Sequence, residues 1–118
     1  MRVLLADDHA QVRWALRTVI GEEPGLTVVG EVSDAENLIS QAQALHPDLI
    51  LLDWEMAGPL VDDLLSSLHA LKRQPRVIVL SQRPESEATA LAAGSDAFVS
   101  KADPPERLLS ALRRLVRR

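Results

Sequence analysis

Short apolar runs alternate along the chain with longer segments whose apolar residues recur at helical spacing. The runs are four to seven residues long and rich in Val, Leu and Ile, which is typical of buried strands. They lie at residues 3–6, 26–32, 49–53, 77–81 and 97–101. The second run mixes apolar and polar residues, so we predict an edge strand there.

Five helices are predicted between and after these runs. Val12, Leu16 and Val19 share one face of the first, which ends near Gly21. The second is capped by Ser33 or Asp34 and closed by Pro47, the third lies around residues 60–71, and the fourth covers residues 85–93.

The start of the last helix carries the clearest signal. Asp103 can cap it, Pro104 suits the first helical position, and Glu106 stands three residues after Asp103, as in a capping box. The pattern therefore predicts a helix that begins at Pro104.

Strands that alternate with helices through short loops predict a parallel sheet covered by helices on both faces. Right-handed crossovers and a length of 118 residues favour a single flavodoxin-like (βα)5 domain over residues 1–118, with a doubly wound five-stranded parallel sheet in order 2-1-3-4-5. In that order, the first and third strands are neighbours.

Composition excludes several classes of protein. The chain has no cysteine, so disulfides, thiolate metal sites and cysteine nucleophiles are ruled out. Its apolar runs are far shorter than the ~20 residues that a membrane span needs, and no signal peptide is apparent. We expect a cytoplasmic protein that does not contact membranes.

Charge is distributed unevenly. The net charge is −4, yet Arg113, Arg114, Arg117 and Arg118 crowd the last six residues, so that the first 112 residues carry a charge of −8. This excess of negative charge repels phosphate groups, so we predict that this chain does not bind nucleic acid directly. The basic end, residues 113–118, is either the last turn of a helix or the start of a linker to an absent output domain.

Three carboxylates follow two of the predicted strands. Asp7 and Asp8 end the first run, and Asp53 ends the third. Because the carboxyl ends of neighbouring parallel strands face one crevice, these side chains are expected to converge. Two carboxylates ~4 Å apart repel by about 4 kcal/mol at an effective dielectric near 20, so a divalent cation is expected between them.

Ser81 and Lys101 end two further strands at the same edge. This constellation resembles the receiver domain of two-component response regulators, most closely the receivers of LuxR-type transcription regulators. The resemblance covers the whole chain and is carried by Ala6-Asp7-Asp8-His9, residues 51–56, Leu80-Ser81, and residues 93–101.

The resemblance implies a phosphorylation site. Asp53 would accept the phosphoryl group, and Asp7, Asp8, Asp53 and the backbone carbonyl of Glu55 would hold Mg²⁺, with Asp7 acting mainly through water. The histidines at 9, 46 and 69 are scattered along the sequence, and we expect no metal or catalytic role for them.

The resemblance also implies a switch. Lys101 and Ser81 would contact the phosphoryl group, Phe98 would be the switching aromatic residue, and Glu55 and Arg83 would tune the lifetime of the acyl phosphate by pairing across the mouth. The surface of the fourth helix, fifth strand and fifth helix would then change, and a homodimer can form through it. Ala57-Gly58-Pro59 departs from the family pattern, so the loop before the third helix is left open.

The implied partners are a sensor histidine kinase and a fused DNA-binding output domain outside this chain. The alternative is a stand-alone receiver or phosphorelay carrier that acts by protein contact. A Mg²⁺-dependent aspartyl-phosphate phosphatase fits less well, because such enzymes need an aspartate two residues after the nucleophile, where this chain has Glu55. We therefore expect no enzymatic activity beyond the chain's own phosphorylation and dephosphorylation.

Overall fold

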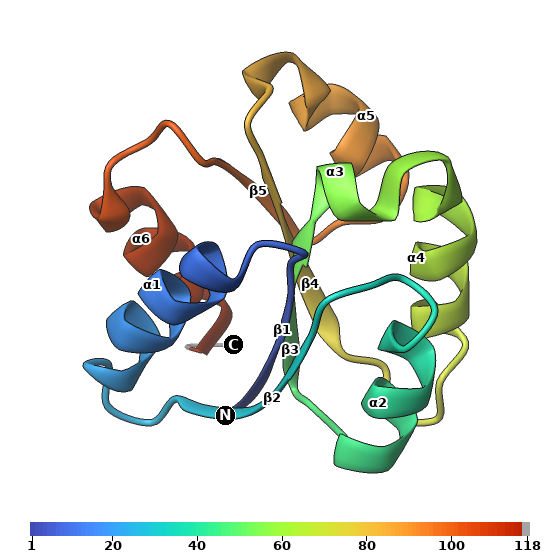
Figure 1. Cartoon of the computed structure of the whole chain (residues 1–118), viewed down its shortest axis with the longest axis horizontal. Helices are drawn as coiled ribbons and strands as arrows, with labels where there is room; N and C mark the ends of the chain where they lie inside the picture. Colours follow the sequence, from blue (N-terminus) through green and yellow to red (C-terminus); the bar gives the residue numbers. More distant parts are fainter. Residues whose placement is uncertain (117–118) are drawn as a thin grey trace.

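Five parallel strands form one sheet in the order β2-β1-β3-β4-β5 (Figure 1). The computed structural model describes residues 1–116. The strands are β1 (Arg2–Ala6), β2 (Thr27–Val32), β3 (Leu49–Asp53), β4 (Arg76–Ser81) and β5 (Ala97–Ser100). The predicted fold class and strand order are confirmed, and β2 is an edge strand as predicted.

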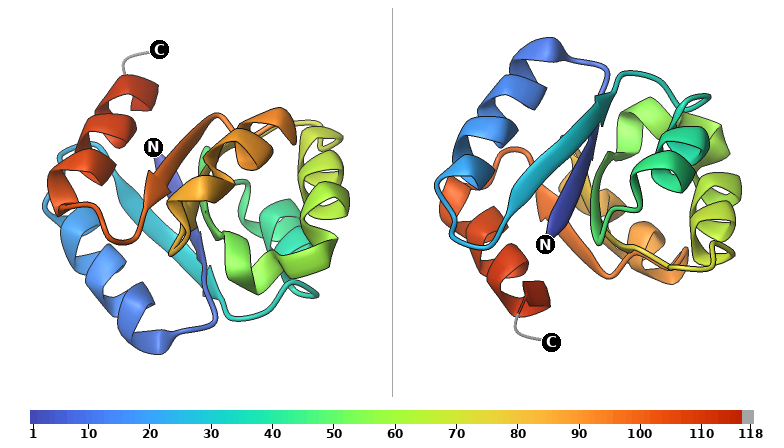
Figure 2. Two further views of the ribbon diagram at one scale, coloured as in Figure 1. Left: turned by 90° about the horizontal axis from the view of Figure 1, so that it is seen from above. Right: turned by 90° about the horizontal axis from the view of Figure 1, so that it is seen from below.

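Helices cover both faces of the sheet. Helices α1 (Ala10–Gly21) and α6 (Pro105–Val116) lie on one side, and α2 (Leu38–Leu45), α4 (Val61–His69) and α5 (Glu87–Ala92) lie on the other, as Figures 1 and 2 show. A short helix, α3 (Trp54–Ala57), and two 3-10 turns, η1 (Gly58–Leu60) and η2 (Pro84–Ser86), lie at the end of the sheet where the strands finish.

The continuous apolar runs are explained by two cores, one on each face of the sheet. Leu4, Ile50 and Leu52 belong to the core under α2 and α4, whereas Leu5 and Leu51 belong to the core under α1 and α6. Alternate residues of a strand point to opposite faces, so a strand covered on both sides is apolar at every position.

The last helix begins one residue later than predicted, at Pro105. Asp103 does not cap it in the predicted way: its carboxylate accepts a hydrogen bond from the backbone N–H of Ser100 at 3.3 Å. That contact closes the turn after β5, and the N–H of Arg107 donates to the carbonyl of Pro104 at 3.0 Å. Pro105 therefore takes the first helical position.

Helix α3 was not predicted. The carboxylate of Asp53 accepts a hydrogen bond from the N–H of Glu55 at 3.2 Å, so the strand's last residue is also the N-cap of a one-turn helix. The third and fourth predicted helices are shorter than expected: α4 covers Val61–His69 where residues 60–71 were predicted, and α5 covers Glu87–Ala92 where residues 85–93 were predicted. The predicted cap Asp34 instead accepts from the N–H of Asn37 at 2.9 Å, one residue ahead of α2.

The basic end of the chain is partly helical. Arg113 and Arg114 lie in the last turn of α6, and Arg113 pairs with Glu23 at 2.7 Å. Arg117 and Arg118 lie outside the described residues. Across residues 1–116, no helix has both the length and the apolar character needed to cross a membrane.

Candidate functional site

The register of the sheet places Asp7 beside Asp53. Ala6 is the partner of Leu52, so the next residues, Asp7 and Asp53, lie side by side at the carboxyl end of the sheet. The N–H of Asp7 donates to the carbonyl of Val32 at 3.1 Å, which fixes the segment against β2 as well. Both carboxylates are buried, with 1% of each residue exposed.

Lys101 supplies the cation that these two carboxylates share. Its Nζ lies 2.9 Å from Asp7 Oδ2 and 3.1 Å from Asp53 Oδ1. The N–H of Lys101 donates to the carbonyl of Ser81 at 2.7 Å, so the residue that follows β5 is still held against β4. One ammonium faces two buried carboxylates, and the cluster therefore keeps an excess of negative charge.

One oxygen of Asp53 is left without a partner. Asp53 Oδ2 is buried and makes no hydrogen bond, and it is the one such side-chain atom found in residues 1–116. Burial raises the pKa of Asp53 to about 6; the hydrogen bond from Lys101 opposes this shift, and the charge of Asp7 adds to it. A buried carboxylate oxygen without a donor is costly, so it suits a cation or an incoming electrophile.

Asp8 and His9 form the solvent-exposed rim of the cluster. His9 Nδ1 lies 2.9 Å from Asp8 Oδ1 and 3.3 Å from Asp7 Oδ1. One ligand atom from each of Asp7, Asp8, His9 and Asp53 lies within 4.8 Å of the other three. The three aspartates were predicted to lie together; His9 was not predicted with them, although its place directly after Asp8 was the available signal. The four donors fit a divalent cation.

Ser81 closes the opposite side of the site. Its buried Oγ donates to Glu55 Oε2 at 2.9 Å and accepts from the N–H of Arg83 at 3.0 Å. Glu55 Oε1 accepts from the N–H of Gln82 at 2.7 Å. The predicted ion pair between Glu55 and Arg83 does not form in the described part of the chain, because the carboxylate is engaged by Ser81 and Gln82.

Phe98 is the second residue of β5. It is half-buried, is the register partner of Val79 on β4, and packs against the core under α2 and α4. Its switching role stays a prediction.

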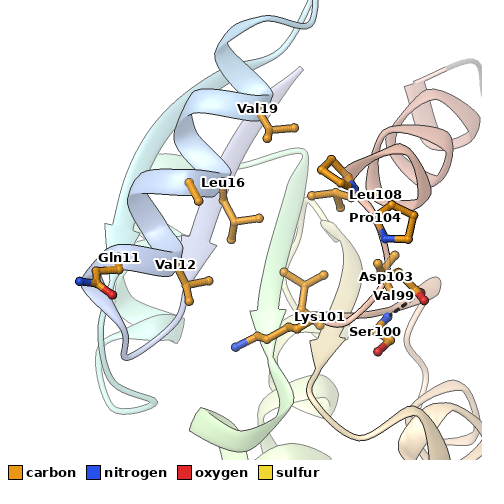
Figure 3. A pocket seen from close by; sticks show the side chains of 13 residues that line it. Gln11, Val12, Leu16, Val19, Val99, Ser100, Lys101, Asp103, Pro104 and Leu108 are labelled. Atoms are coloured by element: carbon orange, nitrogen blue, oxygen red, sulfur yellow. Dashed lines mark hydrogen bonds between the residues drawn. The ribbon is translucent and has the colours of Figure 1, made fainter.

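An apolar groove of about 350 Å³ lies next to the acidic cluster, between α1 and the start of α6 (Figure 3). Val12, Leu16 and Val19 of α1 face Val99 and Leu108 across it. Its lining is mainly apolar, and Lys101, the cation of the acidic cluster, also lines it.

Comparison with known proteins places these features in a family. The family model described as "Response regulator receiver domain" matches residues 3–113. The nitrate/nitrite response regulator protein NarL of Escherichia coli (strain K12) is 40% identical over 112 residues, which cover 93% of this chain and 52% of NarL. NarP of the same strain is 35% identical over 114 residues, 95% of this chain and 53% of NarP.

Solved structures of response regulators have the same fold as this chain. The LuxR-family response regulator of Aurantimonas sp. SI85-9A1 superposes with a TM-score of 0.88 at 27% identity, covering 99% of this chain and 86% of that chain. RcsB of Salmonella enterica serovar Typhimurium, bound to promoter rprA with the phosphomimetic BeF3⁻, gives a TM-score of 0.87 at 26% identity over 99% and 60% of the two chains.

The chain spans about half the length of the curated relatives it matches. The family match extends over nearly the whole described chain, and the resemblance noted in the sequence is confirmed. The chain belongs to the response regulator receiver domain family.

Proposed function

We propose that this receiver is cytoplasmic, accepts a phosphoryl group on Asp53 from a sensor histidine kinase, with Mg²⁺, and changes its interaction surface in response. The observation that supports this most is Asp53 Oδ2, a buried oxygen without a hydrogen-bond partner, with the second oxygen of the same carboxylate held by Lys101. One oxygen is positioned and the other is free to react.

The reaction is a phosphoryl transfer. A carboxylate oxygen of Asp53 would attack phosphorus, the bond from phosphorus to the donor would break, and an acyl phosphate would form while the electron pair leaves with the donor. Asp8, Asp53 and the backbone carbonyl of Glu55 would hold Mg²⁺, with Asp7 acting through water, and when bound the ion would offset the charge between carboxylate and phosphoryl group. Lys101 offers its ammonium to a phosphoryl oxygen.

The switch requires Ser81 to change partners. Its hydroxyl now donates to Glu55, and it would turn to the phosphoryl group once Asp53 is modified. Movement of the β4–α5 segment would then reach Phe98 and the surface of α5, β5 and α6, on which Leu91 is 45% exposed. We propose this surface as the homodimer interface. Separately, Glu55 and Arg83 remain the residues proposed to set the lifetime of the acyl phosphate.

The output is proposed to lie outside this chain. NarL and NarP are about twice as long as the matched region, and the related RcsB is bound to a promoter, so we propose a DNA-binding output domain outside this chain. A stand-alone receiver or relay carrier is the alternative. Some relatives are enzymes, such as the protein-glutamate methylesterase of Alkalilimnicola ehrlichii, 31% identical over 106 residues but matched over only 27% of its length. For this chain we propose no catalysis beyond its own phosphorylation and dephosphorylation.

Intact-mass spectrometry after treatment with acetyl phosphate and Mg²⁺ tests the proposal. We expect one phosphoryl adduct, stable in acid and lost in base, on the wild type and none on Asp53→Asn. Asp62→Asn makes the same chemical change at an exposed residue in the first turn of α4 and should be modified normally. An adduct that survives Asp53→Asn would rule out Asp53 as the acceptor.

Replacing Glu55 with alanine is expected to tighten binding of the phosphoryl mimic beryllofluoride by about five- to tenfold, because Ser81 no longer has to leave a charged hydrogen-bond acceptor. Titration followed by Trp54 fluorescence in a Trp14→Phe background measures this. Glu55→Gln removes the charge but keeps an acceptor for Ser81, so it should resemble the wild type more closely. Equal effects of both variants would show that charge repulsion, and not the hydrogen bond, sets the affinity.

A further inference from the structure

We propose that His9 is an additional ligand of the acidic metal site and makes the site bind Zn²⁺-like first-row transition dications more tightly than Mg²⁺. The inference rests on the metal site of the proposed function and adds to it a nitrogen donor and a selectivity. It names a residue that the aspartate-based site does not require.

The geometry supports a four-donor site. Ligand atoms of Asp7, Asp8, His9 and Asp53 lie within 4.8 Å of one another, and Asp53 Oδ2 is buried and unpartnered. Tetrahedral Zn²⁺ with bonds near 2.1 Å sets its ligands about 3.4 Å apart. The outer two side chains, Asp8 and His9, are exposed, so they are free to rotate inward over the last ångström or so.

The chemistry of the donors predicts the selectivity. Mg²⁺ prefers oxygen ligands and keeps several waters, so a nitrogen at the rim adds little to its binding. Imidazole suits Zn²⁺ and its neighbours, whose affinities for mixed nitrogen and oxygen sites rise along the Irving–Williams series. Three carboxylates with one imidazole therefore favour the transition metal, and His9 is the residue that separates the two kinds of ion.

His9 also has a role that is independent of its side chain. Its backbone N–H donates to Asp7 Oδ1 at 2.9 Å, which shapes the loop between β1 and α1. A substitution keeps this N–H, so His9→Ala removes the imidazole without removing the loop contact. The competing interpretation, in which the ring only pairs with Asp8, predicts that Mg²⁺ and Zn²⁺ change the environment of His9 alike and that His9→Ala leaves the affinity for Zn²⁺ unchanged.

Calorimetric titration at one pH tests the proposal, with Mg²⁺ and Zn²⁺ as probes and a competing chelator for Zn²⁺. We expect His9→Ala to weaken Zn²⁺ binding by at least about tenfold and to change Mg²⁺ binding by less than about twofold. His46→Asn is the matched control, because His46 has a φ of 48° that asparagine tolerates, and it should leave both affinities unchanged. In the ¹⁵N spectrum of histidine side chains, Zn²⁺ should shift the Nδ1 resonance of His9.

The Asp8→Ala variant distinguishes a failure of the metal site itself from a failure of the role assigned to His9. If Asp8→Ala abolishes Mg²⁺ binding but His9→Ala leaves Zn²⁺ binding intact, the metal site stands and the role of His9 is wrong. If Asp8→Ala changes neither affinity, the site itself is wrong, and the inference about His9 is overturned with it. Equal losses of Mg²⁺ and Zn²⁺ in His9→Ala would also overturn the selectivity.

Discussion

Replacing Lys101 with alanine is expected to lower the free energy of unfolding of the metal-free protein by about 2–4 kcal/mol at about pH 7.5. The lysine is the shared partner of Asp7 and Asp53, both of which are buried, and its removal leaves two carboxylates facing each other without a cation. Breaking a buried ion pair usually costs about 3–5 kcal/mol, and we take a lower figure because the Lys101 side chain is 14% exposed and water can enter the gap.

Urea unfolding in the presence of a chelator measures this loss. Lys72→Ala is the matched control, since Lys72 is the other lysine of the chain and is exposed, and it should change stability by less than about 0.5 kcal/mol. Mg²⁺ should restore part of the stability of Lys101→Ala, because a bound dication replaces the missing charge and stabilises the folded state by mass action. Similar losses in the two lysine variants would show that Lys101 is not the cation on which the site depends.

The strands and their order could be predicted because both faces of the sheet are covered. Complete burial makes runs such as residues 49–52 apolar at every position, and short connections leave few topologies for five such runs. Once β1 and β3 are neighbours in this register, Asp7 and Asp53 must lie side by side at the carboxyl end of the sheet. The pattern of apolar runs along the sequence therefore suffices to predict that these aspartates converge.

The hydrogen bonds around the acidic cluster could not be predicted, because each of these side chains has several possible partners. Glu55 was expected to pair with Arg83, and it instead accepts hydrogen bonds from Ser81 and Gln82. Helix α3 is too short to show a periodic pattern, and its cap is the carboxylate of Asp53, which was predicted as a phosphoacceptor and metal ligand but not as a helix cap. The position of His9 within the cluster likewise depends on how the loop after β1 turns.

Asp53→Asn is expected to stabilise the metal-free protein by about 1–2 kcal/mol at about pH 7.5. Burial raises the pKa of Asp53 from 3.8 to about 6, so the ionised carboxylate costs free energy in the folded state. The folded protein binds more protons than the unfolded chain between these two values, and the stabilising effect of protonation is lost as pH rises through about 6. Asparagine carries no charge, so it avoids the cost at neutral pH.

The stabilisation should decline on acidification, because the wild type recovers stability as Asp53 takes up a proton. Thermal unfolding in a chelator from about pH 7.5 down to about pH 5 should show roughly half of the difference disappearing. Asp62→Asn, on the exposed first turn of α4, should show no such gain. A variant less stable than the wild type at neutral pH would mean that the bond to Lys101 outweighs the burial of the charge. A gain at neutral pH would identify Asp53 as a residue kept at the expense of stability, as expected of a buried oxygen reserved for a metal and a phosphoryl group.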